Sequence, residues 1–273
     1  MTAIAFDDKH VAAFFDIDGT LLAPPSLERQ FLAALRRQGA IPLRNYFLWL
    51  ARAVRLSLRG FAAMQHTNKM YLRGVRADEC KRKNQQPVQP KFIAQKPRDG
   101  AAVGVPRFFP AAIEQVLWHA RRGHAIVLAS GTLEPLAMEV GLAVTMLLAV
   151  RGVAVTVAVC ATQLEESAGR WTGRIAGEAM FGEAKARAVR RIIRENKFDA
   201  GQCYAYGDSW SDRAMLDAAG RAAVVHPSRR LARVAHKKKW AVLAWAAEKS
   251  STRSSLRTQS AQRKTEEIWE KAG

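Results

Sequence analysis

The sequence predicts an open α/β fold: a Rossmann-like parallel sheet covered by helices, with an all-helical cap inserted after the first strand. One observation is that apolar runs of strand length recur along the chain, at residues 11–16, 124–130, 153–161, 203–208 and 222–226. The other is that helical patterns separate most of these runs. Continuous apolar strands alternating with helices are typical of a parallel sheet that is buried on both faces.

The helices of the predicted core follow in order. The patterns predict helices over 110–123, 133–148, 182–196 and 211–220, and then a closing helix and a final strand within 228–246. The apolar stretch 136–161 is interrupted by Glu139 and Arg151, and its uninterrupted pieces are too short to span a bilayer. We therefore expect a buried helix and strand there, and no transmembrane segment.

Residues 23–107 lack a strand pattern and predict a helical cap. Ser26 is the expected N-cap of a first helix over 27–39, and further helices are expected over 43–60 and 61–74. Residues 81–106 are rich in Lys, Gln, Pro and Gly and predict a flexible basic loop. The predicted core is then 1–22 with 108–248, and the polar residues 249–273 predict a basic, disordered tail.

The charge of the chain points to anionic partners. It holds 43 Lys+Arg against 24 Asp+Glu, a net charge of +19. Such a field suits phosphorylated small molecules, nucleic acid or an acidic membrane surface, but it also fits a solvated basic surface. The basic tail could bind an anionic partner, while no obligate nucleic acid is expected.

The cysteines and the N-terminus indicate a compartment. Cys80, Cys160 and Cys203 lie far apart, which argues against a disulfide framework or a zinc site. Residues 1–10 show no signal-peptide pattern. Both observations favour a cytoplasmic protein.

Polar side chains gather where the predicted strands end. Asp16 ends the first strand and Asp18 follows two residues later, within VAAFFDIDGTLL. Because ligands of open α/β sheets bind beyond the carboxyl ends of the strands, we expect one shared rim. Singly, each residue has a structural alternative, as a turn residue, a helix cap or a solvated lysine. The other residues expected at this rim are Ser130, Lys185, Asp208 and Asp212.

Four stretches together resemble the motifs of the haloacid-dehalogenase-like (HAD) superfamily, in its order: DIDGT, SGT, the lysine of GEAKARAV, and GDSWSD. The resemblance covers about residues 10–22 and 108–226. The helical insertion and the stretch RWTGRIAGE resemble the phosphoserine-phosphatase-like branch, subfamily IB. The resemblance implies a phosphoric monoester hydrolase that acts on a small phosphorylated substrate.

By the same resemblance, Asp16 is the nucleophile and forms an aspartyl-phosphate, and Asp18 is the general acid/base. Mg²⁺ is the implied cofactor, because a divalent cation makes adjacent carboxylates tolerable and prefers oxygen ligands. Its implied ligands are Asp16, Asp208 and the backbone carbonyl of Asp18. Asp212 is expected to hold a metal-bound water or a neighbouring ligand.

The phosphate is expected to be bound by Lys185, by the Ser130 hydroxyl and by backbone N–H groups near Gly19 and Gly131. The identity of the substrate is predicted less precisely than the way its phosphate is bound. Phosphoserine phosphatases carry a glutamate seven residues after the second aspartate, where this chain has Pro25, and commonly a serine where it has Gly19. A broader phosphomonoesterase is therefore expected.

Two alternatives remain open. One is a phosphoserine phosphatase proper, and the other, from a different class, is a basic nucleic-acid-binding or membrane-surface protein on a HAD scaffold. His119 and His124 are expected to contact helix-end carbonyls rather than a metal. Three aromatic residues are expected in the core of the cap, namely Tyr46, Phe47 and Trp49.

Overall fold

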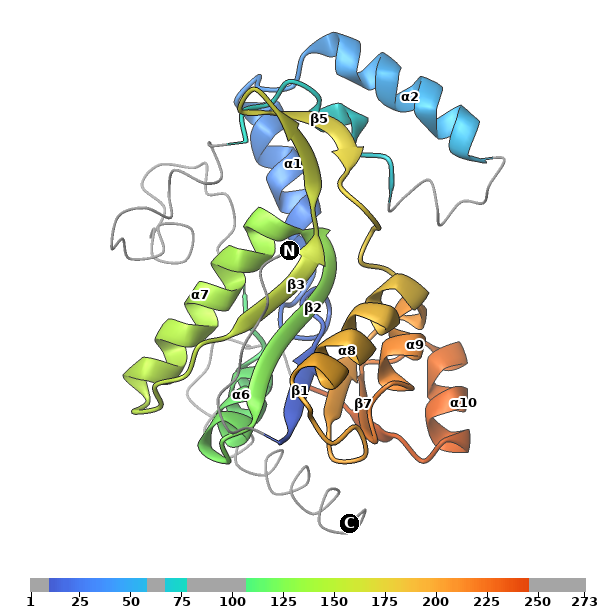
Figure 1. The fold of residues 1–273 in the computed structure, drawn as a ribbon. Coiled ribbons are helices and arrows are strands. Elements are labelled where there is room, and N and C mark those ends of the chain that lie inside the picture. Colours follow the sequence, from blue (N-terminus) through green and yellow to red (C-terminus); the bar gives the residue numbers. More distant parts are fainter. Residues whose placement is uncertain (1–9, 58–66, 78–106, 246–273) are drawn as a thin grey trace, which may run out of the picture.

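A computed structural model of the chain describes residues 10–57, 67–77 and 107–245 (Figure 1). Its centre is a six-stranded sheet in the order β3-β2-β1-β6-β7-β8, and every strand pair is parallel. The predicted open α/β fold is confirmed. The strands are β1 (Ala12–Phe15), β2 (Ala125–Leu133), β3 (Ala158–Thr162), β6 (Tyr204–Gly207), β7 (Arg221–Val225) and β8 (Ala241–Leu243).

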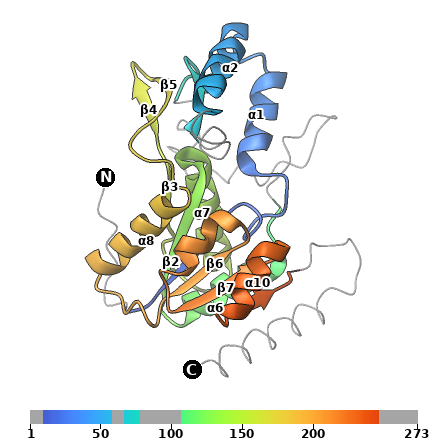
Figure 2. The same cartoon turned by 90° about the vertical axis from the view of Figure 1, so that its right-hand side faces the viewer.

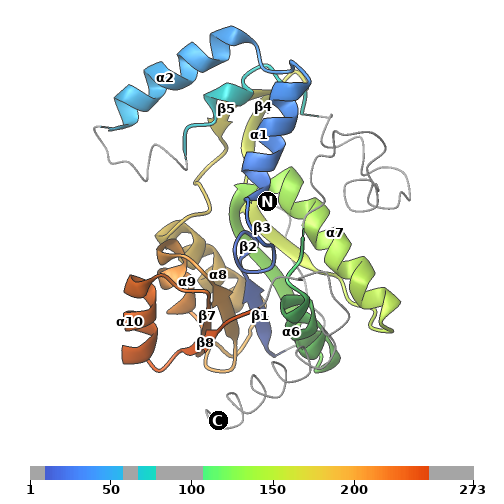
Figure 3. The ribbon, with the colours of Figure 1, turned by 180° about the vertical axis from the view of Figure 1, so that it is seen from behind.

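Helices cover both faces of this sheet. On one face lie α6 (Pro110–Arg121) and α7 (Glu134–Val150), and on the other α8 (Glu183–Glu195), α9 (Arg213–Leu216) and α10 (Arg229–Lys237). Figures 1 and 3 show these two layers from opposite sides, with the sheet between them. The two layers explain why the strands read as unbroken apolar runs, since neither face meets water.

Strand β1 shows how the two cores arise. Its alternating side chains go to different hydrophobic clusters: Ala13 and Phe15 pack with α6 and α7, whereas Ala12 and Phe14 pack with α8, α9 and α10. All four are fully buried. The strand is therefore fixed at the centre of the sheet, and the residues that follow it are held at the sheet's carboxyl edge.

The cap lies beyond that edge and contains α1 (Leu27–Arg37), α2 (Leu43–Ser57) and the 3-10 turn η1 (Met70–Leu72) (Figure 2). A hairpin that the sequence patterns did not predict adjoins it, formed by β4 (Leu164–Ser167) and β5 (Arg170–Ile175). Although these strands follow β3 in the chain, β5 pairs with the cap. The Gly74 N–H donates to the Trp171 carbonyl (2.8 Å), and the Trp171 N–H donates to the Val75 carbonyl (3.0 Å).

Two details of the predicted cap are corrected. The third helix, expected over 61–74, lies partly outside the described residues; among residues 67–74 only Thr67 is α-helical, and η1 and a turn follow. Phe47 and Trp49 are 75% and 37% exposed and do not form a cap core, whereas Tyr46 is half-buried against the main core.

Several boundaries differ from the sequence prediction. β2 continues past Ser130 to Leu133, and β3 begins only at Ala158. The helix expected over 211–220 is a 3-10 turn, η3 (Trp210–Asp212), followed by the four-residue α9. The final helix and strand are present as α10 and β8.

Two predicted segments, the basic loop 81–106 and the tail 249–273, lie outside the described residues. In the part of the chain that the structure describes, no helix combines the length and apolarity that crossing a bilayer requires.

Candidate active site

The carboxyl edge of the sheet brings together the polar residues that follow β1 and β6 and those in the last part of β2. Asp16 directly follows β1, and its N–H donates to the carbonyl of Tyr206 in β6 (2.9 Å). This bond continues the ladder between the two central strands and fixes Asp16 beside the end of β6. Asp208 follows β6, so both carboxylates stand at the middle of the sheet edge.

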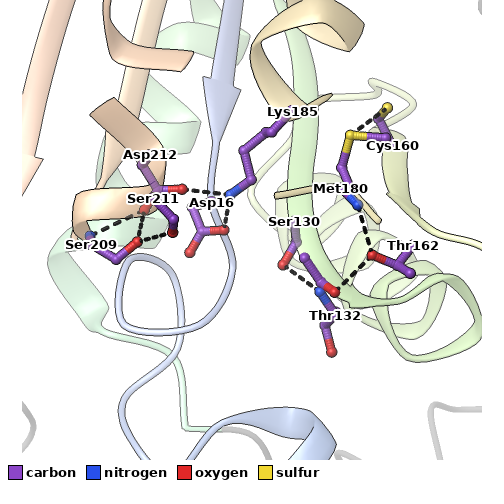
Figure 4. Close-up of polar contacts among 11 residues, drawn as sticks. Asp16, Ser130, Thr132, Cys160, Thr162, Met180, Lys185, Ser209, Ser211 and Asp212 are labelled. Carbon is purple, nitrogen blue, oxygen red and sulfur yellow. Dashed lines mark hydrogen bonds and ion pairs between the residues drawn. The ribbon is translucent and has the colours of Figure 1, made fainter. Parts of the chain in front are cut away.

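A buried lysine connects the acidic residues. Lys185, in the first turn of α8, donates to Asp16 Oδ1 (2.7 Å) and to Asp212 Oδ1 (2.6 Å). Figure 4 shows its side chain reaching between the two carboxylates, with Ser130 on the other side. The side chains of Lys185, Asp16 and Asp212 are 3%, 8% and 1% exposed. The sequence placed all these residues at one rim, and the structure brings them together there.

The carboxylates form a group that fits a hard divalent cation. Asp16, Asp208 and Asp212 each offer one oxygen, and these oxygens lie within 4.8 Å of one another. Three carboxylates face one lysine, so the buried site carries excess negative charge when all are ionised. Oxygen ligands of this kind suit Mg²⁺. The residues present therefore fit the expected metal.

The absence of a side chain at Gly19 leaves space for the Asp208 carboxylate of that group. Its φ is +85°, and a Cβ at this position would lie 2.2 Å from Asp208 Oδ2. A side chain here would force Asp208 away from the site. The Gly19 N–H donates to the Leu22 carbonyl (2.8 Å), so in this conformation it is already used within the loop.

Asp212 is held by residues that the sequence interpretation did not single out. Its Oδ2 accepts hydrogen bonds from the Ser209 N–H (3.1 Å) and the Ser209 hydroxyl (2.6 Å). A Cβ on Gly207 would lie 2.6 Å from the Asp212 Cβ. The glycine and serine of YGDS thus let Asp212 fold back against the end of β6. The sequence did contain a sign of this arrangement: Ser209 and Asp212 are three residues apart, which is the spacing of a capping box, and the structure forms one over η3.

The site shifts the acidities of its carboxyl groups. Burial raises the pKa of Asp16, Asp212 and Asp208 raise it further, and Lys185 opposes this. Burial also raises the pKa of Asp208 to about 7, with Asp212 adding to the shift. Burial would lower the pKa of Lys185, but Asp16 and Asp212 outweigh it and the pKa rises. The lysine therefore stays charged.

Asp18 joins the site to the cap. Its Oδ1 accepts the N–H of Leu27 (2.8 Å), the first residue of α1. The expected N-cap bond of the Ser26 side chain is not made. Burial raises the pKa of Asp18 to about 6, and nearby Glu28 raises it further while the Leu27 bond lowers it. Near neutral pH, this carboxyl group can hold or release a proton.

The stretch SGT lies at an irregularity of the sheet. The Ser130 hydroxyl is 2% exposed and accepts the Thr132 N–H (3.3 Å), and the β2–β3 register shifts between Ser130 and Leu133. The Gly131 carbonyl accepts the Thr162 hydroxyl (2.8 Å). Figure 4 shows this short network beside Lys185.

Two threonines of these motifs were not singled out from the sequence. Thr20 and Thr132 carry buried hydroxyls for which the described residues and their contacts supply no hydrogen-bond partner. Such groups are rare in folded proteins. Each directly follows a glycine of a motif, Gly19 and Gly131, so the unsatisfied oxygens belong to the loops that carry the site residues.

The cap adds a buried polar cluster close to Asp18. Glu28 accepts hydrogen bonds from Lys69 and Tyr71, which lie at the start of and within η1. Lys69 is 3% exposed, and the Glu28 carboxylate is its ion-pair partner. Sequence patterns gave no signal for this pair because 41 residues separate its members.

The cap arginines are divided between solvent and a cavity. At the base of α1 a cavity of about 500 Å³ is lined by Arg29, Arg37 and Arg107, with Pro24 and Pro25 on its wall. Arg44 and Arg55 of α2 are exposed. Two arginines of α1, Arg29 and Arg37, therefore line this cavity, whereas those two arginines of α2 face solvent.

The two histidines differ from expectation in their partners. His119 is fully buried, and its Nδ1 lies 2.8 Å from His124 Nδ1 while its Nε2 lies 2.8 Å from the Tyr206 hydroxyl. Gln115 donates to the same hydroxyl (3.0 Å). Both ring nitrogens of His119 are therefore used by His124 and by Tyr206 of β6, because the fold stacks α6 on the aromatic face of β6.

The fold and this edge define a class of α/β enzyme in which an acidic cluster and a lysine share one buried site. The sequence profile of the haloacid dehalogenase-like hydrolases matches residues 13–217, which is most of the chain. The chain belongs to this family. The prediction that the chain is a haloacid-dehalogenase-like hydrolase is confirmed at the level of the family.

Curated relatives agree with this assignment. A probable phosphatase of Mycobacterium tuberculosis is 39% identical over 85 residues, which are 31% of this chain and only 29% of that protein's length. A protein of Streptomyces azureus, named for inhibition of morphological differentiation, is 29% identical and matches 85% of this chain and 77% of its own. A phosphoserine phosphatase of M. tuberculosis is 27% identical, over 86% of this chain and 71% of its own.

Solved structures share the fold. A Bordetella pertussis protein of unknown function superposes with a TM-score of 0.59 at 23% identity, over 86% of this chain and 98% of that one. A substrate-bound phosphoserine phosphatase gives a TM-score of 0.54 at 16% identity, over 89% and 96%. At these identities the likeness concerns the arrangement of the chain.

Proposed function

We propose that this protein is a Mg²⁺-dependent phosphomonoester phosphatase that acts through an aspartyl-phosphate on Asp16. The observation that carries the proposal is the buried group of Asp16, Asp208 and Asp212 around Lys185. A nucleophilic carboxylate, a fixed cation and oxygen ligands for a metal are what transfer of a phosphoryl group requires. The proposed substrate is a small phosphorylated metabolite.

The residues divide the work between two steps. An Asp16 oxygen attacks phosphorus, the bond from phosphorus to the leaving oxygen breaks, and Asp18 gives its proton to that oxygen. In the second step Asp18 takes a proton from water as the water oxygen attacks phosphorus, which frees Asp16 and releases phosphate. A pKa of Asp18 raised to about 6 allows both directions of proton transfer.

The remaining groups hold the phosphate. Lys185 keeps its charge and already contacts Asp16, so it can neutralise phosphoryl oxygens beside the nucleophile. The Ser130 hydroxyl and the N–H of Gly131 are proposed as hydrogen-bond donors. Mg²⁺, held by Asp16, Asp208 and the Asp18 carbonyl with Asp212 in support, would neutralise the negative charge that the carboxylates and phosphate share.

The direct test is hydrolysis of p-nitrophenyl phosphate. Activity is expected with Mg²⁺, lost after chelation with EDTA and restored by added Mg²⁺. Asp208→Asn is the matched variant, because it keeps the shape of the side chain while removing a charged ligand, and its activation should need more Mg²⁺. Full turnover after exhaustive chelation would contradict the metal assignment.

A phosphoserine phosphatase proper is the second candidate, favoured by the name of one relative and of several structural neighbours. Two observations weigh against it. Pro25 stands where the substrate's ammonium group would meet a glutamate, and the Glu28 carboxylate of the cap is already paired with Lys69. A panel of phosphorylated metabolites separates the two. The proposal of a broader phosphomonoesterase is wrong if phosphoserine has the highest kcat/KM of the panel.

A binding protein on an inactive scaffold is the alternative from another class, and the net charge of +19 suits it. The complete set of site residues speaks for catalysis instead. The proposed compartment is the cytoplasm, where thiols such as those of Cys160 and Cys203, both free and buried, stay reduced.

A further inference from the structure

Helix α2 presents a continuous apolar stripe to solvent. Leu43, Phe47, Leu50 and Val54 are 79%, 75%, 55% and 65% exposed. At 3.6 residues per turn, their spacing places them within about 60° of one another around the helix axis. Large apolar side chains gathered in this way mark interaction surfaces, whereas singly exposed ones do not.

The opposite side of α2 is fixed to the cap, so the stripe cannot simply turn inward. Asn45 is fully buried, and its Nδ2 donates to the carbonyls of Tyr71 (3.1 Å) and Arg73 (2.7 Å). Asn68 donates to the Trp49 carbonyl (2.8 Å), and Ala53 is buried. Figures 1 and 2 show α2 at the end of the cap farthest from the sheet.

The charges beside the stripe have one sign. Arg44 and Arg55 are exposed at its edge, and the helix contains no Asp or Glu. Phe47 supplies an aromatic ring within the stripe itself. Apolar and aromatic residues on one face with arginines alongside are the features of helices that lie in the headgroup region of a membrane.

Helix α7 offers an internal comparison. It also exposes apolar side chains, among them Met138 and Leu142, at 47% and 44%. However, it carries Glu134 and Glu139 and no Lys or Arg. An anionic surface would attract α2 and not α7.

We propose that α2 docks the protein on an anionic lipid surface, with the stripe between the headgroups and with Arg44 and Arg55 against anionic headgroups. A second copy of the chain is a poorer occupant, because pairing two α2 faces would bring arginines together and oppose two net charges of +19. The inference is independent of the proposed catalytic function.

The test is co-sedimentation of the full chain with vesicles of phosphatidylcholine alone, and of phosphatidylcholine mixed with phosphatidylglycerol. Binding is expected to the mixed vesicles. F47S/L50S should weaken it by at least about tenfold, since apolar burial is lost, and the α7 variant M138S/L142S should leave it unchanged. R44Q/R55Q should weaken binding to mixed vesicles by roughly fivefold for each arginine. A chain shortened after Glu248 should still bind, which separates α2 from the basic tail.

Turnover of p-nitrophenyl phosphate, or the melting temperature if turnover is absent, shows that each variant is folded. The proposal is overturned if the full chain stays in the supernatant, or if F47S/L50S binds like the unaltered protein. It is also overturned if binding disappears on removal of residues 249–273. A dimer that F47S/L50S dissociates, together with no vesicle binding, would show that a second copy covers the stripe.

Discussion

At the scale of single residues, two neighbouring carboxylates receive different surroundings. Asp16 contacts Lys185 within the acidic group, so a positive charge faces its carboxylate at the carboxyl edge of the sheet. Asp18 instead accepts the Leu27 N–H of the cap and lies near Glu28. Different partners thus give two chemically identical groups different surroundings, which suits the different roles proposed for them, nucleophile and proton carrier.

This difference predicts separate effects of two asparagine variants. Asp16→Asn removes the attacking oxygen, so no phosphoenzyme should form. Asp18→Asn keeps the nucleophile but loses the proton carrier, so turnover should fall by on the order of 10²–10⁴-fold. With p-nitrophenyl phosphate, whose leaving group needs little protonation, hydrolysis of the phosphoenzyme should slow more than its formation.

Mass spectrometry after an acid quench measures the outcome. Aspartyl-phosphate should accumulate on Asp18→Asn and be absent from Asp16→Asn. Phosphate found covalently on the Asp16→Asn protein, at any residue, would show that another group is the nucleophile.

At the scale of elements, the cap is held by contacts between segments far apart in the chain. The 3-10 turn η1 joins α1 through Lys69 and Glu28, and joins the hairpin through Gly74 and Trp171. Local patterns predicted α1 and α2 because amphipathic periodicity is visible within one segment. They did not predict the hairpin, whose four-residue β4 has one half-buried and three exposed residues and so gives no apolar signal.

The Lys69–Glu28 pair should matter for stability more than surface pairs do. Glu28→Ala leaves the buried ammonium group of Lys69 without its carboxylate, which should lower the free energy of unfolding by about 3 kcal/mol. The double variant Glu28→Ala/Lys69→Met removes both charges and should recover most of the loss. Urea denaturation measures each value.

The exposed pair of Arg187 and Glu178 provides the control, since its side chains are 55% and 67% exposed. Glu178→Ala should leave the unfolding free energy unchanged within error. If Glu28→Ala were as mild as this control, Lys69 would have found water or another partner, and the pair would not be an anchor of the cap.

The histidine pair between α6 and β6 predicts a pH dependence. Burial lowers the pKa of His119 well below 6.5, with His124 and Arg122 adding to the shift, while Tyr206 and Gln115 are neutral neighbours. Above pH 6.5 His119 is neutral in both the folded and the unfolded chain. As the pH falls below 6.5, the unfolded chain binds the proton first, so stability is lost.

Thermal unfolding at several pH values tests this. The unaltered protein should lose stability more steeply between about pH 7 and pH 5 than His119→Gln, by up to about 1.4 kcal/mol per pH unit. Comparing the two proteins cancels the titration of the carboxylates, which both share. Equal slopes would mean that His119 takes up its proton without unfolding.

At the scale of the whole molecule, the sequence-based prediction agrees best with the structure for the central sheet, whose strands are buried on both faces. The six strands, their covering helices and the edge that carries Asp16 and Lys185 all follow from unbroken apolar runs and from polar residues at their ends. The pairing of β5 with the cap and the capping of α1 by Asp18 depend on tertiary contacts, so no local pattern shows them. The outward face of α2 was misjudged for the same reason, because amphipathicity does not tell which face meets the protein.

Strand β8 leads to a prediction about where the folded core ends near the C-terminus. Strand β8 completes the sheet, and Trp245, 4% exposed, packs near Phe109 and Tyr206 at ring distances of 6.4 Å each. The residues of the proposed active site all precede Trp245 in the chain. A chain shortened after Glu248 keeps these contacts, so its kcat/KM for p-nitrophenyl phosphate should stay within about twofold and its melting temperature should be unchanged. In the same shortened chain, Trp245→Ala should lower the free energy of unfolding by about 3–5 kcal/mol, because it removes a buried indole from the core. The shortened chain and its Trp245→Ala variant differ by one side chain, so urea denaturation and turnover of the two together show where the folded core ends. If the shortened chain with Trp245 intact fails to fold, residues 249–273 supply part of the core, and the boundary lies beyond Glu248.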